Sequence, residues 1–381
     1  MAAWILDLEQ VIWETLCACR TSLPTLGNGC LRVTVVYLEH SIPWFGPASG
    51  YWLLPQYVQR TAGHRVEVAR YKHTLWQRGL GRLANVTFGL SRNSVAAAAE
   101  LRFQFKLARD RRAVGHILSL DDHLAFWSSH RNGNANRIIG TLHQPASRWT
   151  EPMRRMLRRV EQAIVLYERD LDWFQQTIGP DRVHFVRYGV DTDFFRPAAA
   201  PWDDGAEQSI LFAGHWLRNT EMLARIVAKL VAYKPSVRFD FLVPLQWRNA
   251  PGLSQLLEHP NVRWHANLND QELLSLYQRS YLLLLPLLDG GGNTALVESL
   301  ACGLPIVTTD AGGTRSYGAG SLYPVVANDD DGAMLDLIVA YLEDPKRRQE
   351  ISERSRRFAE EKLSWDVTAL QHADLYKRLF A

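Results

Sequence analysis

Two successive series of strand and helix patterns, joined by a linker, restrict the fold of this sequence more than any other feature. The first series contains six short apolar runs bounded by turn residues, at 31–38, 65–71, 116–120, 137–142, 163–167 and 183–186. Apolar residues at helical spacing lie between some of these runs, at 51–61 and 151–160. Strands that alternate with helices build a parallel sheet with right-handed crossovers.

The second series begins after residues 198–208, whose Ala, Pro, Asp and Gly content is typical of a linker. It contains strand patterns at 209–213, 238–243, 262–265, 281–286 and 305–308, and helical patterns at 220–233, 270–279, 293–302 and 333–342. We therefore predict an α/β protein with two doubly wound, Rossmann-like domains that face a cleft, at 31–200 and 201–362. Residues 1–30, where apolar residues recur at helical spacing, form an N-terminal extension.

Composition excludes several other classes of protein. With 47% hydrophobic and 22% charged residues in 381, the chain is not disordered, collagenous or a coiled coil. The longest apolar run, Tyr281–Leu288, is far shorter than the roughly 20 residues that span a bilayer. Asp7, Glu9 and Glu14 interrupt the N-terminal apolar stretch, which lacks the basic start of a signal peptide. Four cysteines fit neither a disulfide framework nor a zinc site, so we predict a cytoplasmic protein without a metal.

The charge is divided unevenly along the chain. Residues 1–200 carry a formal charge of +8 and residues 201–381 carry −5, which indicates an anionic partner for the first half. Four arginines of the predicted 151–160 helix and the N-terminal tryptophans fit peripheral attachment to an anionic membrane surface. The alternative is an ordinary solvated helix face. The positive charges are spread and no nucleic-acid-binding module is recognisable, so we expect no nucleic-acid partner.

The strongest candidate for a binding site is the turn after the apolar run 282–288. Gly290, Gly291 and Gly292 let a ligand approach the backbone closely. Asn293 and Thr294 then open a helix, whose free amides and partial positive charge suit a phosphate. Glu298 lies about one turn further on, where its carboxylate could accept hydrogen bonds from a ribose diol. The alternative is a plain capped helix with a surface glutamate.

Two other strand ends of the second half carry candidate residues. Gly214 permits a tight turn, and Arg218 precedes a helix that starts at Asn219 and Thr220, so its guanidinium could grip a diphosphate. The alternative is a solvated arginine near the helix cap. The loop His265–Asn269 precedes another helix and could contact a nucleobase through its backbone.

Two strand ends of the first half point to the same cleft. The Gly46–Gly50 loop follows the first strand, and His143 follows the strand 137–142 with Pro145 close behind. We expect His143 to have a role in the cleft, although a lone histidine is more often a core or surface residue. Asp121, Asp122 and His123 follow another predicted strand, but their spacing matches no metal motif.

Four segments carry a resemblance to a known family. They are 187–197, 212–219, 290–307 and 363–366 with the helix after it. On these segments, residues 31–381 resemble a glycosyltransferase of the GT-B architecture, close to the retaining family 4 (glycosyl transferases group 1). The resemblance implies that the second domain binds a nucleotide-diphosphate sugar and that the first binds a hydroxyl acceptor. That acceptor is a glycan, a lipid-linked sugar or a small metabolite. Residues 363–381 are implied to cross back to the first domain.

The same resemblance assigns roles to single residues. It implies that Arg218 and the amides of Asn293 and Thr294 hold the diphosphate, that Glu298 holds the ribose, and that His143 faces the transferred sugar. We therefore take His143, Arg218 and Glu298 as catalytic. The other residues that we expect to contact the donor are Gly50, Gly214, His215, Asn219, His265, Leu268, Gly290, Gly291 and Gly292. The nucleotide-diphosphate sugar is a co-substrate, and the resemblance implies no metal or other cofactor.

The chain also departs from the family pattern. Gly290 stands where the family often has a glutamate that contacts the donor sugar, and His215 and Arg218 replace an arginine and a lysine. One alternative is therefore an inactive homologue that binds a sugar nucleotide or serves as a partner subunit. A nicotinamide dehydrogenase is disfavoured, because the first loop holds Gly46 and Gly50 at the wrong spacing for Gly-x-Gly-x-x-Gly.

Overall fold

Two parallel six-stranded sheets form the framework of the computed structural model, which describes residues 32–39, 46–71, 94–110, 112–129, 137–199 and 207–380. Residues Val33–Ala381 form one compact unit. The helix expected within 1–30 and most of the linker at 198–208 lie outside the described residues. We call the parts of the chain around the first and second sheets the first and second lobe. The predicted fold class is confirmed.

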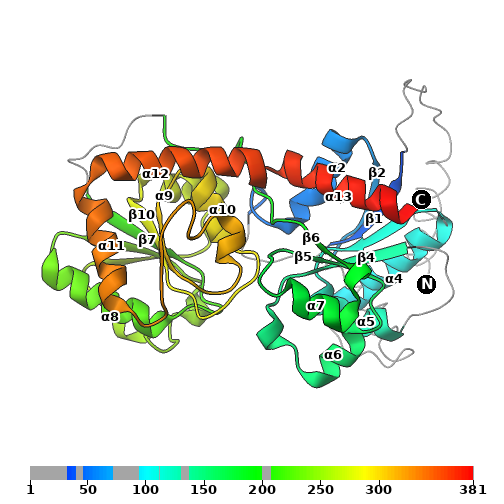
Figure 1. The fold of residues 1–381 in the computed structure, drawn as a ribbon, viewed down its shortest axis with the longest axis horizontal. Helices are drawn as coiled ribbons and strands as arrows, with labels where there is room; N and C mark the ends of the chain where they lie inside the picture. Colours follow the sequence, from blue (N-terminus) through cyan, green and yellow to red (C-terminus); the bar gives the residue numbers. More distant parts are fainter. Residues whose placement is uncertain are drawn as a thin grey trace, which may run out of the picture. The chain divides into compact units, whose positions relative to one another are not determined.

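The first sheet has the strand order β2-β1-β3-β4-β5-β6, and every neighbouring pair is parallel. Its strands are β1 (Thr34–Leu38), β2 (Arg65–Ala69), β3 (Val114–Ile117), β4 (Arg137–Leu142), β5 (Gln162–Val165) and β6 (Val183–Phe185). The connecting helices are η1 (Tyr51–Leu53), α2 (Leu54–Ala62), α4 (Ser94–Arg109), α5 (Leu120–Ser129), η2 (Ala146–Arg148), α6 (Glu151–Leu157), α7 (Leu171–Ile178) and η3 (Pro180–Arg182) (Figure 1). All β1 residues after Thr34 are buried, so this strand runs through the core.

The second sheet has the order β12-β11-β10-β7-β8-β9 and is also parallel. Its strands are β7 (Ser209–Ala213), β8 (Arg238–Leu242), β9 (Val262–His265), β10 (Leu282–Leu285), β11 (Ile306–Thr309) and β12 (Val325–Val326). Its helices are α8 (Thr220–Tyr233), η4 (Leu245–Trp247), η5 (Ser254–Leu256), α9 (Asp270–Arg279), α10 (Thr294–Ala301), η6 (Thr314–Tyr317), α11 (Asp331–Glu343) and α12 (Pro345–Phe358). No helix in the described ranges is long and apolar enough to cross a membrane.

One predicted strand of the first lobe is displaced. We expected a strand at 116–120, but β3 ends at Ile117 and α5 begins at Leu120. Asp121 and Asp122 therefore lie in the first turn of a helix, where acidic side chains interact favourably with the helix dipole. They do not lie in a loop after a strand. Leu118 and Leu120 lie on either side of the turn, and both are apolar and buried. The apolar pattern therefore continues beyond the observed end of β3 at Ile117.

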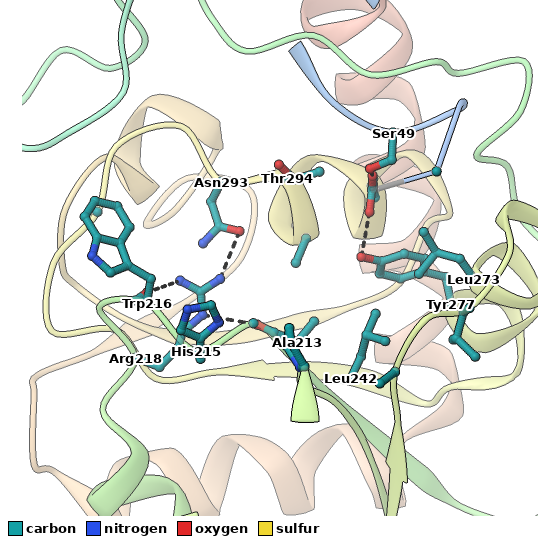
Figure 2. A pocket seen from close by; sticks show the side chains of 18 of the residues that line it. Ser49, Ala213, His215, Trp216, Arg218, Leu242, Leu273, Tyr277, Asn293 and Thr294 are labelled. Carbon is teal, nitrogen blue, oxygen red and sulfur yellow. Dashed lines mark hydrogen bonds between the residues drawn. The ribbon is translucent and has the colours of Figure 1, made fainter. Parts of the chain in front are cut away.

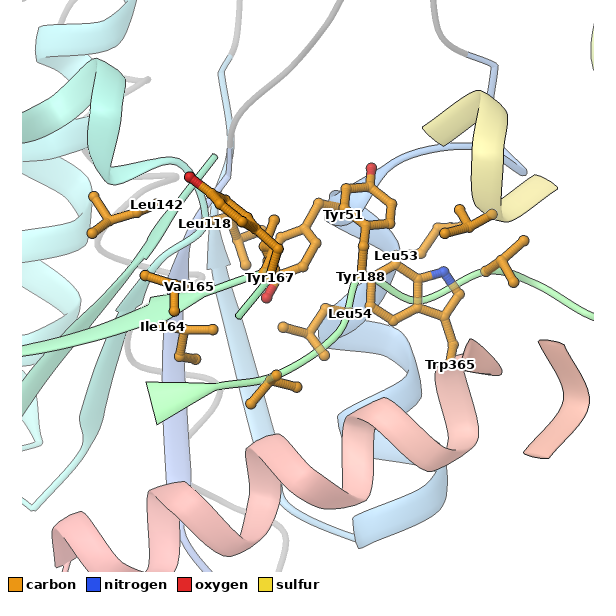
Figure 3. Packing of buried hydrophobic residues seen from close by; sticks show 14 of the residues in the cluster. Tyr51, Leu53, Leu54, Leu118, Leu142, Ile164, Val165, Tyr167, Tyr188 and Trp365 are labelled. Atoms are coloured by element: carbon orange, nitrogen blue, oxygen red, sulfur yellow. The ribbon is translucent and has the colours of Figure 1, made fainter. Parts of the chain in front are cut away.

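The C-terminal helix α13 (Trp365–Phe380) packs against α2 of the first lobe, after a π-helical turn at Ala359–Leu363. The backbone N–H of Val190 donates to the Leu363 carbonyl at 2.8 Å, and the N–H of Trp365 donates to the Val190 carbonyl at 3.0 Å. The Trp365 ring lies 5.6 Å from the Tyr51 ring and 6.0 Å from the Tyr188 ring (Figure 3). The last helix therefore completes the core of the first lobe.

A buried polar network joins α13 to the first sheet. Tyr376 hydroxyl contacts His116 Nδ1 at 2.6 Å, and the other nitrogen of that ring contacts Thr141 Oγ1 at 2.8 Å. On the next turn of α13, His372 Nε2 contacts the Tyr51 hydroxyl at 2.8 Å. Burial lowers the pKa of His372 to about 4, so this ring is neutral at physiological pH and accepts from Tyr51. Each buried polar group named here thus has a partner.

Candidate active site

A cavity of about 410 Å³ lies at the carboxyl ends of the strands of the second sheet (Figure 2). In a doubly wound sheet this is the edge at which ligands bind. The loop after β1 in the first lobe supplies Gly46 and Ser49 to its wall. The second lobe supplies Ala213, Gly214, His215, Trp216, Arg218, Leu242, Pro244, Ala266, Asn267, Leu268, Leu273, Tyr277, Gly290, Gly291, Gly292, Asn293, Thr294, Ala295 and Glu298.

One wall of the cavity is the glycine turn and the start of α10. The Asn293 side chain caps the helix by accepting from the Leu296 N–H at 3.3 Å, so the first turn of α10 opens beside Gly290–Gly292. The glycines also let the two lobes approach each other. A Cβ at Gly291 would collide with the His143 carbonyl oxygen, and one at Gly292 would lie 3.0 Å from the Tyr188 ring. The turn therefore combines a helix N-terminus with side-chain-free packing against the first lobe.

The Arg218 guanidinium lies next to this helix start. Its Nε donates to the Ala213 carbonyl at 3.1 Å, one terminal nitrogen donates to the Trp216 carbonyl at 3.0 Å, and the other lies 3.5 Å from Asn293 Oδ1. No carboxylate of the described residues forms an ion pair with it. Desolvation lowers the pKa of Arg218 to about 10, so it stays charged at neutral pH. A partly buried cation without a counter-charge is suited to an anionic ligand.

Gly214 makes this position of the guanidinium possible. Its φ of +87° lies in the left-handed region, which favours glycine. A Cβ there would lie 2.8 Å from a terminal nitrogen of Arg218.

The opposite wall holds the Glu298 carboxylate, which is only 3% exposed. The Ser49 hydroxyl of the first lobe donates to Oε1, and the Tyr277 hydroxyl of α9 donates to Oε2 at 2.8 Å. Burial raises the pKa of Glu298 to about 7, although both hydrogen bonds act in the opposite direction. Of the described residues that line the cavity, Glu298 alone carries a carboxylate. The cavity therefore has a cationic end and a hydrogen-bond-accepting end.

Between these ends the lining is mostly apolar. This apolar part of the lining suits a flat ring, and it consists of Leu242, Pro244, Ala266, Leu268 and Leu273, which we call the apolar slot. At the rim, His215 stacks on Trp247, with ring centroids 4.4 Å apart and planes 9° apart. Burial lowers the pKa of His215 to about 4, so His215 is neutral and Arg218 is the cation of this cavity.

Comparison with known proteins finds a family that resembles part of the second lobe. Residues 253–358 match the family described as glycosyl transferases group 1. The match covers the part of the second lobe that contains the glycine turn and α10, so this segment is similar to that family.

Curated relatives also resemble this chain over about half of its length. Over 221 residues the chain is 28% identical to D-inositol 3-phosphate glycosyltransferase 2 of Catenulispora acidiphila, which covers 52% of this chain and 51% of that protein. It is 26% identical over 213 residues to MMP alpha-(1->4)-mannosyltransferase of Mycolicibacterium hassiacum, covering 54% and 50%. The chain thus spans about half the length of the curated relatives it matches.

Two solved structures show the same fold. Sucrose-phosphate synthase from Thermosynechococcus elongatus superposes with a TM-score of 0.71 at 16% identity, covering 92% of this chain and 99% of that one. The Anabaena protein HepE, in complex with UDP and glucose, superposes with a TM-score of 0.69 at 14% identity, covering 91% and 100%. At these identities the likeness concerns the fold, which is the GT-B architecture.

Most of the residues that the sequence analysis expects to contact the donor line the cavity. The cavity brings together Gly214, His215, Arg218, Leu268, Gly290, Gly291, Gly292, Asn293, Thr294 and Glu298. Four expected residues do not line it. Gly50 leads into η1 with a φ of +120°, and the buried Asn219 side chain caps α8 by accepting from the Met222 N–H at 3.0 Å. His265 turns away to donate to Asp240 at 2.6 Å.

His143 is the fourth of these residues, and it lies behind the glycine wall. Its Nε2 donates to the Leu118 carbonyl at 2.8 Å, and its ring lies 5.1 Å from Tyr51. Its backbone N–H donates to Asp121 at 2.8 Å, and its carbonyl oxygen meets Gly291. Burial raises the pKa of Asp121 to about 7. His143 thus faces the cleft through its backbone, and its ring packs in the first lobe.

Several lining residues were missed by the sequence analysis. Ser49 was passed over within a Gly-Pro loop, although its place after the first strand was a usable signal. Tyr277 and Leu273 fit an ordinary core stripe of α9, and nothing local distinguishes them from other buried residues. Asn267 belongs to the loop that the sequence analysis expects to contact a base, but its φ of +54°, which makes the sharp turn after β9, is not visible in the sequence.

Proposed function

We propose that this chain is a glycosyltransferase that moves a sugar from a nucleotide-diphosphate sugar to a hydroxyl acceptor, with retention, in glycan, polysaccharide or glycolipid synthesis. The observation that carries the proposal is the Arg218 guanidinium, which has no ion-pair partner in the described part of the chain and lies beside the start of α10. A diphosphate supplies the missing negative charge. HepE, which shares the fold, was solved with UDP-glucose, and the relatives carry glycosyltransferase names.

The cationic, hydrogen-bond-accepting and apolar parts of the cavity suit the diphosphate, the ribose and the base of a nucleoside diphosphate. Arg218 and the amides at Asn293 and Thr294 take the diphosphate. Glu298 accepts from the ribose hydroxyls, and the apolar slot beside Leu242 and Leu268 takes the base. The transferred sugar then lies at the glycine wall, on whose other side is the His143 carbonyl.

The reaction follows from where charge develops. The bond between the sugar and the diphosphate breaks through an oxocarbenium-like state, and negative charge grows on the leaving diphosphate. Arg218 and the α10 amides bind that charge more strongly as it grows, which lowers the barrier. The leaving phosphate takes the acceptor proton as the acceptor oxygen bonds to the sugar. Close packing of the lobes at Gly291 keeps water from the donor.

Ligand binding and turnover test this proposal together. We expect UDP, GDP or ADP to raise the unfolding temperature, because a ligand at a hundred times its Kd stabilises the fold by about 2.7 kcal/mol. The matching nucleotide sugar, mixed with phosphosugar and glycan acceptors, should then release nucleoside diphosphate. If no nucleotide changes the unfolding temperature at millimolar concentration, the proposal is wrong.

A second candidate function, an inactive sugar-nucleotide-binding homologue or partner subunit, is supported by Gly290. The adjacent carboxylate does not replace the missing glutamate: Asp289 accepts from the Gly290 N–H at 2.8 Å and from the Ser147 hydroxyl at 2.6 Å. Asp289 does not line the cavity. Nucleotide binding without release of nucleoside diphosphate on any acceptor would favour this candidate.

We also propose that the first lobe attaches to an anionic membrane surface at the cytoplasmic face. Arg155 and Arg158 of the α6 segment have side chains 73% and 61% exposed, and Glu151 is the acidic group that they share. The protein should float with vesicles containing 30% anionic lipid at low salt, and binding should weaken as salt rises. Replacing Arg155 and Arg158 with glutamine should release it. Equal flotation of that double variant would contradict the attachment.

A further inference from the structure

The loop after β1 reaches across to the second lobe at two points. The Ala48 N–H donates to Asp270 Oδ2 at 2.9 Å, and the Ser49 hydroxyl donates to Glu298 Oε1. Gly46 lies so close to Asp270 that a Cβ there would collide with the carboxylate. Residues 46–50, which we call the bridging loop, therefore rest on α9 and α10 through hydrogen bonds to two carboxylates.

The contact at Glu298 differs from the one at Asp270 because it faces the cavity. Ser49 and Glu298 both line the cavity, whereas Asp270 does not. Ser49 is 2% exposed and Glu298 is 3% exposed, so the hydrogen bond between them is largely shielded from bulk water. Oε2 already accepts from Tyr277 on the same lobe. A ligand that donates to Glu298 from the cavity therefore meets a carboxylate whose two oxygens each already accept from one hydroxyl.

A ribose hydroxyl and the Ser49 hydroxyl are chemically alike, since each is an aliphatic O–H that donates to a carboxylate. Without a ligand, Ser49 satisfies a buried carboxylate that would otherwise be costly to leave unpaired. A ribose diol brings two such donors.

We infer that Ser49 and the ribose of the nucleotide are alternative partners of Glu298, so that donor binding displaces Ser49 and detaches the bridging loop from α10, while its contact with Asp270 on α9 remains. This inference rests on the proposed function. Ser49 is thereby a specificity-determining residue, because a ligand that brings no hydroxyl to Glu298 leaves the Ser49 contact in place. The displaced residue lies two positions before Tyr51, whose ring packs on His143, so occupation of the nucleotide site is coupled to the first-lobe side of the cleft.

Calorimetric titration of a Ser49→Ala variant tests the exchange. The probe is whichever of UDP, GDP and ADP binds the wild type most tightly, and pyrophosphate serves as the ligand without a ribose. We expect the variant to bind the nucleotide about tenfold more tightly, because no Ser49 hydrogen bond to a charged group has to be broken. Its affinity for pyrophosphate should match that of the wild type.

Two further variants make the result specific. Ser147→Ala removes another hydroxyl contact between the lobes, the one to Asp289 at 2.6 Å, outside the cavity, so it should leave nucleotide affinity unchanged. Ser49→Cys keeps the side-chain volume but donates weakly, and it should shift affinity in the same direction as Ser49→Ala if the alanine variant folds poorly.

The possible outcomes separate the two proposals. The exchange is overturned if the Ser49 variants bind the nucleotide no more tightly than the wild type, or if their affinity for pyrophosphate rises by the same factor. In either case, nucleotide binding by the wild type still supports the proposed function. If the wild type binds none of the three nucleotides, the proposed function itself fails.

Discussion

Replacing Arg218 with methionine is expected to weaken nucleoside-diphosphate binding by between about tenfold and a hundredfold, the scale of a lost hydrogen bond to a charged group. Methionine retains much of the length and apolar character of the arginine stem, so the loss should come from the charge. The guanidinium is held by the carbonyls of Ala213 and Trp216 and therefore points at the cavity before a ligand arrives. A preorganised cation loses little freedom on binding, and so its removal has a large effect.

Calorimetry and initial rates together measure this effect. The loss in kcat/KM should equal or exceed the loss in affinity, since negative charge on the diphosphate grows as the donor bond breaks. Arg248→Met is the matched control. Arg248 belongs to the same lobe and donates to the Val243 carbonyl at 3.1 Å, but it does not line the cavity. If Arg218→Met binds nucleotide as the control does, Arg218 does not hold the diphosphate.

Replacing Glu298 with glutamine is expected to have two opposite effects, with nucleotide binding about tenfold weaker and the unliganded protein more stable at pH 8. Burial raises the pKa of Glu298 from its ordinary value of 4.5 to about 7. The free energy of unfolding therefore includes a favourable contribution that is fully present below about pH 4.5 and lost as the pH rises through 7. A shift of this size corresponds to on the order of 3 kcal/mol. Glutamine has no charge to desolvate and so avoids that loss.

Urea unfolding of the two proteins at pH 5.5 and pH 8 measures this difference. The wild type should lose more stability between these values than Glu298→Gln. Burial also raises the pKa of Asp121 to about 7, and Asp121 remains in both proteins. The stability of the variant should therefore still fall between pH 5.5 and pH 8, but by less than that of the wild type. Glu361→Gln, at an exposed position, is the control and should behave as the wild type. If the free energy of unfolding of Glu298→Gln falls with pH as steeply as that of the wild type, Glu298 ionises freely in the fold.

Local signals predicted much of the framework. The observed bounds of β4, β7, β9, α8 and α9 are those expected, because turn residues or helix caps mark their ends, such as the capping box at Asn269 and Glu272. Among the described residues, four α-helices were not predicted: α4, α5, α7 and α12. Of these, α12 is polar on nearly all sides, and its buried face includes Arg348, whose guanidinium lies 3.8 Å from the Tyr281 ring centroid. Such a face leaves almost no apolar periodicity in the sequence.

Some features of the site could be predicted from local sequence, and others depend on the tertiary structure. The glycine turn, the α10 start and Arg218 are local features of strand ends, and all of them line the cavity. The orientation of His265 depends on the neighbouring strand, because the register of β8 and β9 brings Asp240 within 2.6 Å of its ring. The pairing of Ser49 with Glu298 joins residues 249 positions apart, and only the folded arrangement of the lobes reveals it.

The dependence of the first lobe on α13 also affects the order in which a nascent chain can fold. The hydrogen bond from Tyr37 to Tyr376 spans 339 positions, and that between His116 and Tyr376 spans 260. A ribosome delivers Tyr37 before the second lobe and Tyr376 after it, so the first-lobe core stays open while the whole second lobe is synthesised. The second lobe can close its own sheet during this interval. A helix that is translated after the second lobe thus allows the first lobe to finish folding.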